Sequence, residues 1–422
     1  MASEKISLIG AIAISVGGMI GAGIFSILGV VAQAAGAAMW ISFLIGGIIA
    51  LFSTYSYAKL GAKFPSAGGA VEFLVQGWGK GIISGGINSF MWLGYIIAIA
   101  LYAQGFAAYG ITFLHHPATP LLTKSIACAV VILFALINML GAGSVGKAET
   151  FIVAVKLSIL VLFAAVGLFF IHPDNLSPTH YQNIAHIFFG TGVLFIGYEG
   201  FGLITNAAAN MHNPQKNLPK ALYLSVFLVI VIYLAVSIAV IGNLSIHEIY
   251  VSRDFALAQA AKPFLGTIGF KLIAIAALFS TASAINATLF GGANVSYMIA
   301  RDGELPKVFD RTAWRDASGG LIITTALVLV FILFFDLAGI AMMGSGAFLL
   351  IYAAVNAGHL KILKQTGAKK WLVVTSLVLC LILFVILEIY TLQKNPMAVY
   401  TMLFLLVGSF VAEKLYHKKH WS

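Results

Sequence analysis

The chain has 422 residues, of which 61% are hydrophobic and only 9% are charged, and its mean hydropathy is +1.01. Soluble domains are about 45–50% apolar and about 25% charged, so this composition excludes a soluble enzyme, a disordered chain and a nucleic-acid-binding protein. The net charge of +10 does not change this conclusion, because basic residues are common in the cytoplasmic loops of membrane proteins. The composition therefore predicts a polytopic membrane protein.

Twelve apolar runs are long enough to cross a membrane as helices, at about 20 residues per span. The runs are continuous, whereas the strands of membrane barrels alternate between polar and apolar residues. We therefore predict an all-α fold. In chain order the predicted spans are 8–31, 37–57, 82–113, 125–140, 151–171, 187–206, 221–241, 269–300, 321–335, 338–360, 371–390 and 397–414.

The lysines and arginines predict which loops are cytoplasmic. If the N-terminus is cytoplasmic, 18 of the 24 fall on the cytoplasmic side, 5 fall on the opposite side, and Lys156 lies inside a span. This asymmetry is typical of membrane proteins and predicts an inner or plasma membrane protein with both termini in the cytoplasm. The longest loops, 59–80, 243–267 and 301–320, are short, so we predict one transmembrane domain (1–422), with a short outer helix in 243–267.

The first and sixth spans have glycine-rich centres. Glycine inside a helix costs about 0.5–1 kcal/mol relative to alanine, and lipid cannot satisfy backbone groups that leave the helix. One interpretation is close packing of helices through small residues. The position of the two spans, five apart, favours broken helices at matching places in two inverted repeats, which mark the binding site of many transporters. The segments are Gly17-Gly18-Met19-Ile20-Gly21-Ala22-Gly23-Ile24 and Phe195-Ile196-Gly197-Tyr198-Glu199-Gly200.

These broken helices predict a site for a small zwitterion. The second half of span 1 begins with free N–H groups that suit a carboxylate, and freed carbonyls suit an ammonium. Small residues at Gly21-Ala22-Gly23 would let the ligand touch the main chain, and Tyr102 and Phe195 are candidates to line the pocket. A free α-amino acid carries both charged groups. No nucleophile–base pair, phosphate loop or metal-binding spacing appears, so we expect neither an enzyme nor a cofactor.

Two ionisable residues, Lys156 and Glu199, lie well inside predicted spans, where each costs at least about 2.5 kcal/mol. Lys156 could extend its ammonium to the cytoplasmic interface. Alternatively it carries protons, because burial disfavours the charged ammonium and would let the lysine lose its proton in one conformation. Glu199 is either a neutral, hydrogen-bonded structural acid or a contributor to gating.

Four segments resemble motifs of the amino acid–polyamine–organocation (APC) superfamily. They are residues 19–25, residues 195–200, residues 213–221 and residues 300–306. Residues 151–157 and 277–288 are most similar to an archaeal, proton-coupled member of broad amino-acid specificity. The resemblance implies a LeuT-like fold of two inverted five-helix repeats, here 6–171 and 187–360, with two further helices in 371–414.

The resemblance also implies roles for individual residues. It places Lys156 where relatives bind sodium, near the Gly17 carbonyl and the Ser283 hydroxyl. It implies that N–H groups of Ala22, Gly23 and Ile24 hold the substrate carboxylate. The substrate amine would contact the carbonyls of Met19, Val193 and Ile196. Two departures bear on specificity: residues 206–210 contain no acidic residue where many relatives have one, and Ala22 stands where many have serine.

We therefore predict a sodium-independent, proton-coupled amino acid transporter that works by alternating access, with amino acids, protons and the lipid bilayer as its partners. One alternative is an amino acid or amine exchanger without net proton movement. Another is an amino acid receptor or complex subunit that transports nothing. The sequence does not specify the preferred amino acid or the oligomeric state.

Overall fold

The computed structural model describes residues 5–21, 23–66, 68–114, 119–139, 145–301, 303, 309, 312–314 and 317–420. Within these residues, 11 helical segments are long and apolar enough to cross a membrane, and a twelfth apolar helix, α13 (Gly319–Phe334), has 16 residues. The twelve segments coincide with the twelve predicted spans, and the all-helical polytopic fold is confirmed. Hydropathy locates the spans because each must present apolar side chains along its whole length.

The helices of the spans differ in length and in type. In chain order they are α1 (Leu8–Met19), α2 (Gly23–Ala35), α3 (Met39–Lys63), α5 (Ile82–Ile111), α6 (Pro120–Met139), α7 (Val145–Phe169), α8 (Ile184–Leu194), the 3-10 helix η3 (Phe195–Asn210), α9 (Pro214–Asn243), α12 (Lys262–Arg301), α13, α14 (Leu337–Lys361), α16 (Lys370–Lys394) and α17 (Pro396–His420).

Short elements connect the spans. They are α4 (Ala70–Trp78), the 3-10 turns η1 (Pro173–Leu176) and η2 (Pro178–His180), α10 (Ile246–Val251), η4 (Arg253–Phe255), α11 (Ala256–Gln259), the strand pair β1 (Thr312–Trp314) and β2 (Ala317–Ser318), and α15 (Leu363–Thr366). The predicted outer helix in 243–267 is therefore present as α10 and α11. Helix α4 and the strand pair were not predicted, because short amphipathic loop elements leave little trace in hydropathy.

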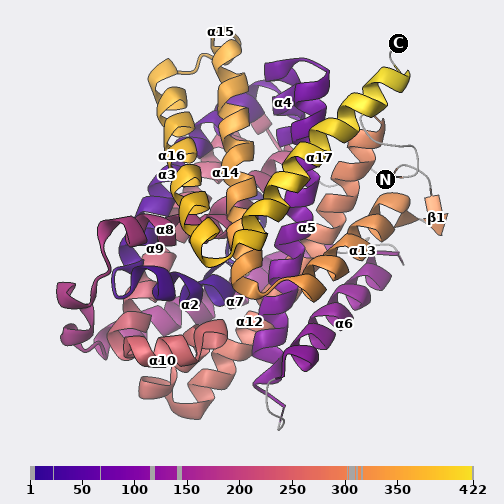
Figure 1. Cartoon of the computed structure of the whole chain (residues 1–422). Helices are drawn as coiled ribbons and strands as arrows, with labels where there is room; N and C mark the ends of the chain where they lie inside the picture. The colour runs from indigo at the N-terminus through magenta and orange to yellow at the C-terminus, as the bar shows by residue number, and fades with distance from the viewer. Residues whose placement is uncertain are drawn as a thin grey trace.

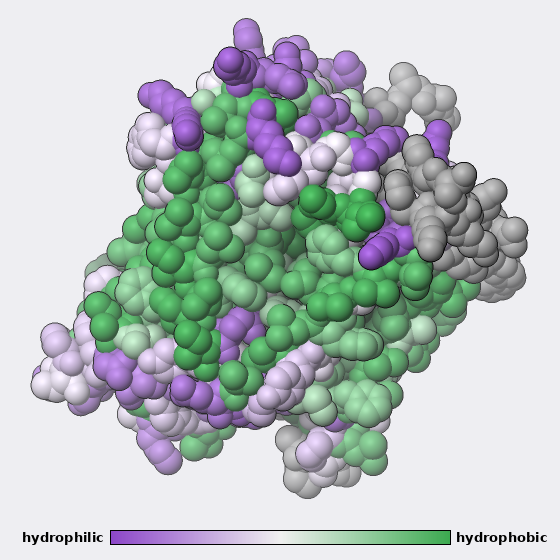
Figure 2. Space-filling model, turned by 45° about the horizontal axis from the view of Figure 1, so that its top comes forward, coloured by the Kyte–Doolittle hydropathy of each residue, from purple (hydrophilic) through white to green (hydrophobic). Residues whose placement is uncertain are grey.

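The spans form one bundle with two polar ends. Figure 1 shows α4 and α15 at one end, here named the α15 end, and α10 at the opposite end, named the α10 end. Figure 2 shows a broad apolar surface between hydrophilic residues that gather toward the two ends. The loops that charge distribution predicts to be cytoplasmic, those with α4 and α15, thus lie together and opposite the predicted outer loop.

The first and sixth spans are interrupted in different ways. Span 1 separates into α1 and α2, with Ile20 and Gly21 in a turn between them. Span 6 does not unwind, contrary to our prediction. Its α-helix passes at Phe195 into η3, a 3-10 helix that continues for 16 residues. Such long 3-10 segments are uncommon, but their own hydrogen bonds satisfy the backbone, which removes the need for an open stretch.

Candidate functional site

Side chains from other helices cap the carbonyl groups at the break in span 1. The Tyr233 hydroxyl on α9 donates a hydrogen bond of 2.6 Å to the Met19 carbonyl. The Ser280 hydroxyl on α12 donates to the Ile20 carbonyl at 2.5 Å and lies 3.1 Å from the Gly21 carbonyl. Unwound backbone in a bilayer requires such partners, since lipid offers none. Hydroxyl groups of at least two neighbouring helices, α9 and α12, therefore stabilise the break.

Lys156 supplies a third cap from α7. Its Nζ donates a hydrogen bond of 3.0 Å to the Gly17 carbonyl in the last turns of α1, which is a contact that the family resemblance implies. The side chain is only 1% exposed. This burial excludes the interpretation that the ammonium reaches water at the interface. Ser283 is buried on α12, and its pairing with Lys156 stays a prediction.

Ser345 on α14 holds the junction between α8 and η3. Its hydroxyl donates to the Val193 carbonyl at 2.8 Å and accepts from the Ile196 amide at 3.0 Å. Tyr233 also donates to the Gly197 carbonyl at 3.1 Å, so one hydroxyl lies between both interrupted spans. A serine hydroxyl can donate one hydrogen bond and accept another. Ser345 therefore bridges the Val193 carbonyl and the Ile196 amide at the point where the helix changes from α to 3-10.

Glycines bring the two interrupted spans into direct backbone contact. A Cβ atom built on Gly200 would lie 2.3 Å from the carbonyl carbon of Gly18. A Cβ atom on Gly23 would lie 2.6 Å from the Tyr233 hydroxyl oxygen and 2.8 Å from the Gly197 Cα. Any side chain there would force the helices apart. Both interpretations of the glycine pattern thus hold, because the residues permit close packing and, in span 1, an open backbone.

Glu199 lies between aromatic hydroxyl groups. Its carboxylate Oε1 accepts a hydrogen bond of 3.0 Å from the Tyr102 hydroxyl, and its main-chain carbonyl accepts one of 2.8 Å from Tyr352 on α14. The glutamate is 2% exposed. Tyr102, predicted to line the substrate pocket, therefore anchors η3 to α5 in this conformation. The gating role of Glu199 stays a prediction.

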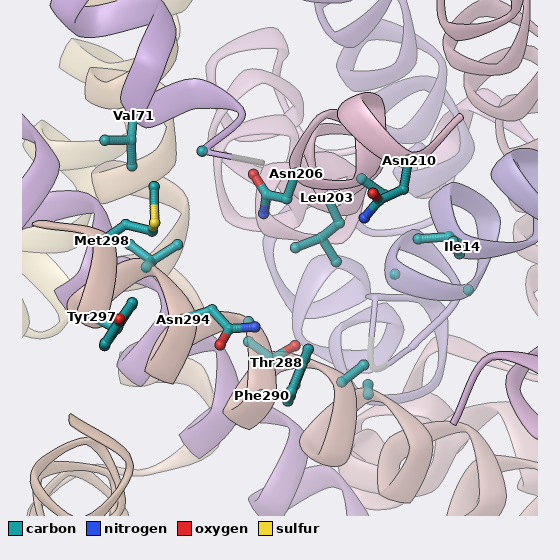
Figure 3. Close-up of a pocket in the computed structure, with 18 residues that line it drawn as sticks. Ile14, Val71, Leu203, Asn206, Asn210, Thr288, Phe290, Asn294, Tyr297 and Met298 are labelled. Carbon is teal, nitrogen blue, oxygen red and sulfur yellow. The ribbon is translucent and has the colours of Figure 1, made fainter. Parts of the chain in front are cut away.

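A cavity of about 590 Å³ approaches the break from the α15 end. It lies between α1, η3 and α12, and α4 contributes Val71 at its edge. Figure 3 shows Asn206, Leu203 and Asn294 at this space, from η3 and α12. At its inner end the cavity touches Gly17, whose carbonyl binds Lys156, and Gly18. The space thus leads from one end of the bundle to the turn of span 1.

The residues predicted to bind substrate lie beyond this cavity. Among the predicted site residues that the structure describes, only Gly17 lines it. Ala22 falls outside the described residues. The other predicted substrate contacts are buried around the break and the junction of span 6. They are Met19, Ile20, Gly21, Gly23, Ile24, Tyr102, Val193, Phe195 and Ile196.

The α10 end covers the other side of the break. Residues of η4 pack so closely on α2 that a Cβ atom on Gly29 would lie 2.0 Å from the Arg253 carbonyl oxygen. Arg253 also forms an ion pair with Asp254 at 3.2 Å. The described cavity therefore reaches the break from the α15 end, while the loop 243–267 packs on α2 at the opposite end.

Sequence reasoning missed the hydroxyl donors that hold the breaks. Tyr233, Ser280 and Ser345 each cap a carbonyl in span 1 or span 6. The available signal was a hydroxyl inside an apolar span, but the chain has many of these. Among the described residues, no group of three or more His, Cys, Asp or Glu side chains is placed to hold a metal ion.

Comparison with known proteins assigns this architecture to a family. Residues 6–412 match the family model described as amino acid permease. An uncharacterized protein of Methanocaldococcus jannaschii is 41% identical over 99% of this chain and 96% of its own. The inner membrane transport protein YbaT of Escherichia coli is 34% identical over 84% of this chain and 82% of its own. The branched-chain amino acid permease BcaP of Lactococcus lactis is 28% identical over 84% of this chain and 81% of its own.

Proposed function

The chain belongs to the amino acid permease family of the APC superfamily, and we propose that this multi-pass membrane transporter moves amino acids together with protons. The observation that carries the proposal is the buried Lys156 ammonium on the Gly17 carbonyl, 3.0 Å away. It is a titratable donor on the backbone beside the break in span 1. The family resemblance implies that relatives bind sodium at this position, where the lysine would supply a cation instead.

The proposed coupling works through the hydrogen bond from Lys156 to Gly17. A protonated ammonium is a charge-assisted donor and binds a carbonyl about twice as strongly as a neutral donor does. Protonation of Lys156 therefore favours the arrangement in which α7 holds the end of α1. Loss of the proton weakens this contact and lets α1 move relative to α7. The cavity that touches Gly17 from the α15 end gives the proton a route to one side of the membrane.

The proposed substrate site uses the ends of α2 and α8. The first N–H groups of α2, at Gly23 and Ile24, have no carbonyl partner within that helix and suit a carboxylate. The amine would contact the carbonyls of Met19, Val193 and Ile196. Two of these already accept hydrogen bonds from Tyr233 and Ser345. A carbonyl oxygen has two lone pairs, so each can accept a second donor.

Alternating access completes the proposal. The two interrupted spans belong to the halves 6–171 and 187–360, which we propose to be inverted repeats, followed by two helices in 371–414. With cytoplasmic termini, the cavity at the α15 end is the cytoplasmic passage, and this conformation opens inward. Closure of that passage and loosening of η4 from α2 would expose the break to the other side.

Proteoliposomes with an imposed pH gradient test the coupling. A gradient of one pH unit can drive about tenfold accumulation for one proton per amino acid. We expect the wild-type protein to approach this ratio, and Lys156→Met, which keeps an unbranched side chain without the ammonium, to equilibrate substrate without accumulating it. The control is Lys216→Met, on an exposed lysine at the start of α9.

Three results would separate the alternatives. Accumulation by Lys156→Met equal to that of the wild type would reject the lysine as the coupling group. Counterflow that ignores the pH gradient in the wild-type protein would favour an exchanger. Specific binding without any flux would favour a receptor or complex subunit.

A further inference from the structure

The cavity at the α15 end is lined mainly by apolar surface, with a few neutral polar side chains. None of the described residues that line it has a charged side chain. Its polar lining includes the carboxamides of Asn206, Asn210 and Asn294 and the hydroxyl of Thr288. Passages that merely conduct water need no such arrangement of amides. From this lining we propose that the cavity is a second substrate subsite, separate from the backbone site, that binds amino acids with neutral side chains.

The three carboxamides come from two elements that face each other. Asn206 and Asn210 lie four residues apart on η3, about one and a third turns of a 3-10 helix, and Asn294 lies on α12. Figure 3 shows Asn206 and Asn294 on opposite sides of the same space, with Leu203 beside them. Asn210 and Asn294 are exposed and mark the mouth, whereas Asn206 is only partly exposed. A ligand that enters past Asn294 would therefore meet Asn206 before it reaches Gly17.

Neighbouring segments hold the backbone of Asn210 and the side chain of Asn206. The main-chain carbonyl of Asn210 accepts a hydrogen bond of 2.8 Å from the Ile6 amide, which ties η3 to the segment before α1. Gly69 has a φ of +50° and packs against Asn206: a Cβ atom there would lie 2.0 Å from the Asn206 Oδ1. The loop before α4 thus limits how Asn206 can turn. Rigid carboxamides bind a ligand at a lower entropic cost than mobile ones.

A carboxamide matches a zwitterion because it both donates and accepts. Its NH₂ group can donate to a carboxylate and its oxygen can accept from an ammonium. It offers no counter-charge for an additional charge on a substrate side chain, and a charge that leaves water without a partner is unfavourable. Apolar neighbours such as Leu203, Val71 and Val295 suit an aliphatic side chain. A volume of about 590 Å³ lies within the usual range of small-ligand pockets, about 300–1,000 Å³.

Charge substitution tests the subsite, which rests on the proposed transport function. In Asn206→Asp and Asn294→Asp the side chain keeps its shape and gains a negative charge. We measure uptake of labelled L-leucine into proteoliposomes and its inhibition by L-lysine and L-glutamate. In the wild-type protein we expect uptake of leucine and weak inhibition by lysine. In each variant we expect lysine to inhibit about tenfold more strongly than in the wild-type protein, since one close opposite charge is worth at least about 1.4 kcal/mol in a partly dry site.

Asn217→Asp is the matched control, because Asn217 lies at the start of α9 outside the cavity lining. A tenfold gain for lysine in the cavity variants, absent from this control, supports the subsite. Equal inhibition patterns in all three variants overturn it and leave the proposed function standing. Equally strong transport of lysine and leucine by the wild-type protein also overturns it. Absence of any amino acid uptake by the folded wild-type protein rejects the proposed function and the subsite together.

Discussion

The two interrupted spans satisfy the hydrogen bonds of their backbone groups in opposite ways. Span 1 opens between Met19 and Gly23, and side chains from α7, α9 and α12 cap its carbonyls. Span 6 stays helical and changes from α to 3-10 hydrogen bonding at Phe195. Ser345, Tyr233 and Tyr352 contact it from outside, but most of its backbone satisfies itself.

Because of this difference, we expect the two spans to have different roles in transport. The open span depends on donors that other helices provide, so any movement of those helices changes its stability. One of these donors, Lys156, can gain or lose a proton. The 3-10 span carries its own acid, Glu199, whose partner is the Tyr102 hydroxyl on α5. We therefore expect coupling to reside at span 1, and span 6 to act as a rigid wall against which span 1 moves.

The largest expected effect comes from a side chain at the contact between the spans. Gly23→Val places its Cβ where Tyr233 and Gly197 now lie, within 2.6–2.8 Å. It also obstructs the N–H groups at the start of α2. We expect amino acid binding to weaken at least about 100-fold, or about 2.7 kcal/mol, in equilibrium binding to purified protein.

The matched control for this substitution is Gly408→Ala, on α17 and outside the cavity lining, because nothing lies within 4 Å of a Cβ at that position. Both proteins are first compared by size-exclusion chromatography in detergent. If folded Gly23→Val binds substrate with unchanged affinity, the site at the break of span 1 is wrong.

A pair of serines compares the spans directly. Ser280→Ala removes the donor of the Ile20 carbonyl, for which the open turn offers no replacement. We expect it to destabilise the protein by about 1–2 kcal/mol, within the range for buried hydrogen bonds and those between membrane helices. Ser345→Ala should cost about 0.5 kcal/mol, since the 3-10 backbone at Val193 and Ile196 can pair locally.

Thermal unfolding in detergent measures both serine variants against the same wild-type preparation. Equal losses of stability would mean that span 6 depends on external donors as much as span 1 does. The contrast between the two spans would then be unsupported.

Glu199→Gln tests whether the acid of span 6 titrates during transport. Glutamine keeps an oxygen that can accept the hydrogen bond from Tyr102. We expect the pH dependence of uptake to match that of the wild-type protein, because a rigid span needs the hydrogen bond and not the charge. A shifted pH profile, measured from pH 5 to pH 8 in proteoliposomes, would make Glu199 part of the coupling mechanism.

The smallest expected change in free energy concerns α10, an exposed helix whose N-terminal side chains form its own capping box. In α10, the Glu248 carboxylate accepts hydrogen bonds from the Ser245 hydroxyl at 2.7 Å and the Ser245 amide at 2.9 Å. These bonds lower the pKa of Glu248 below its ordinary value of 4.5. A group whose pKa is lower in the folded protein stabilises it above the unfolded value, and this contribution disappears as pH falls through the folded value.

Glu248→Gln should therefore speed hydrogen exchange of the α10 amides at pH 6 and have no effect at pH 3, each compared with the wild-type protein at the same pH. The free-energy difference should be below about 1 kcal/mol, because the carboxylate is exposed and water screens it. An equal effect at both pH values would show that the charge does not contribute to the cap.

The amino-acid sequence by itself determined where the chain crosses the membrane. Continuous apolar runs placed all twelve spans, and glycine clusters located both interruptions, because helix length and glycine's flexibility are local properties. The buried lysine was visible for the same reason, as a charge in an apolar run. The predicted orientation, the inverted repeats and the residue roles are proposals that the experiments above address.

Only the tertiary structure decided how the interruptions are built. Tyr233 and Ser280 reach their carbonyl partners from 214 and 260 residues away in the chain. No local pattern distinguishes these hydroxyls from others inside spans. The change of span 6 to a 3-10 helix and the cavity beside Asn206 likewise depend on how α1, η3 and α12 pack. Contacts between distant segments follow from the geometry of the whole bundle, which hydropathy along the chain does not contain.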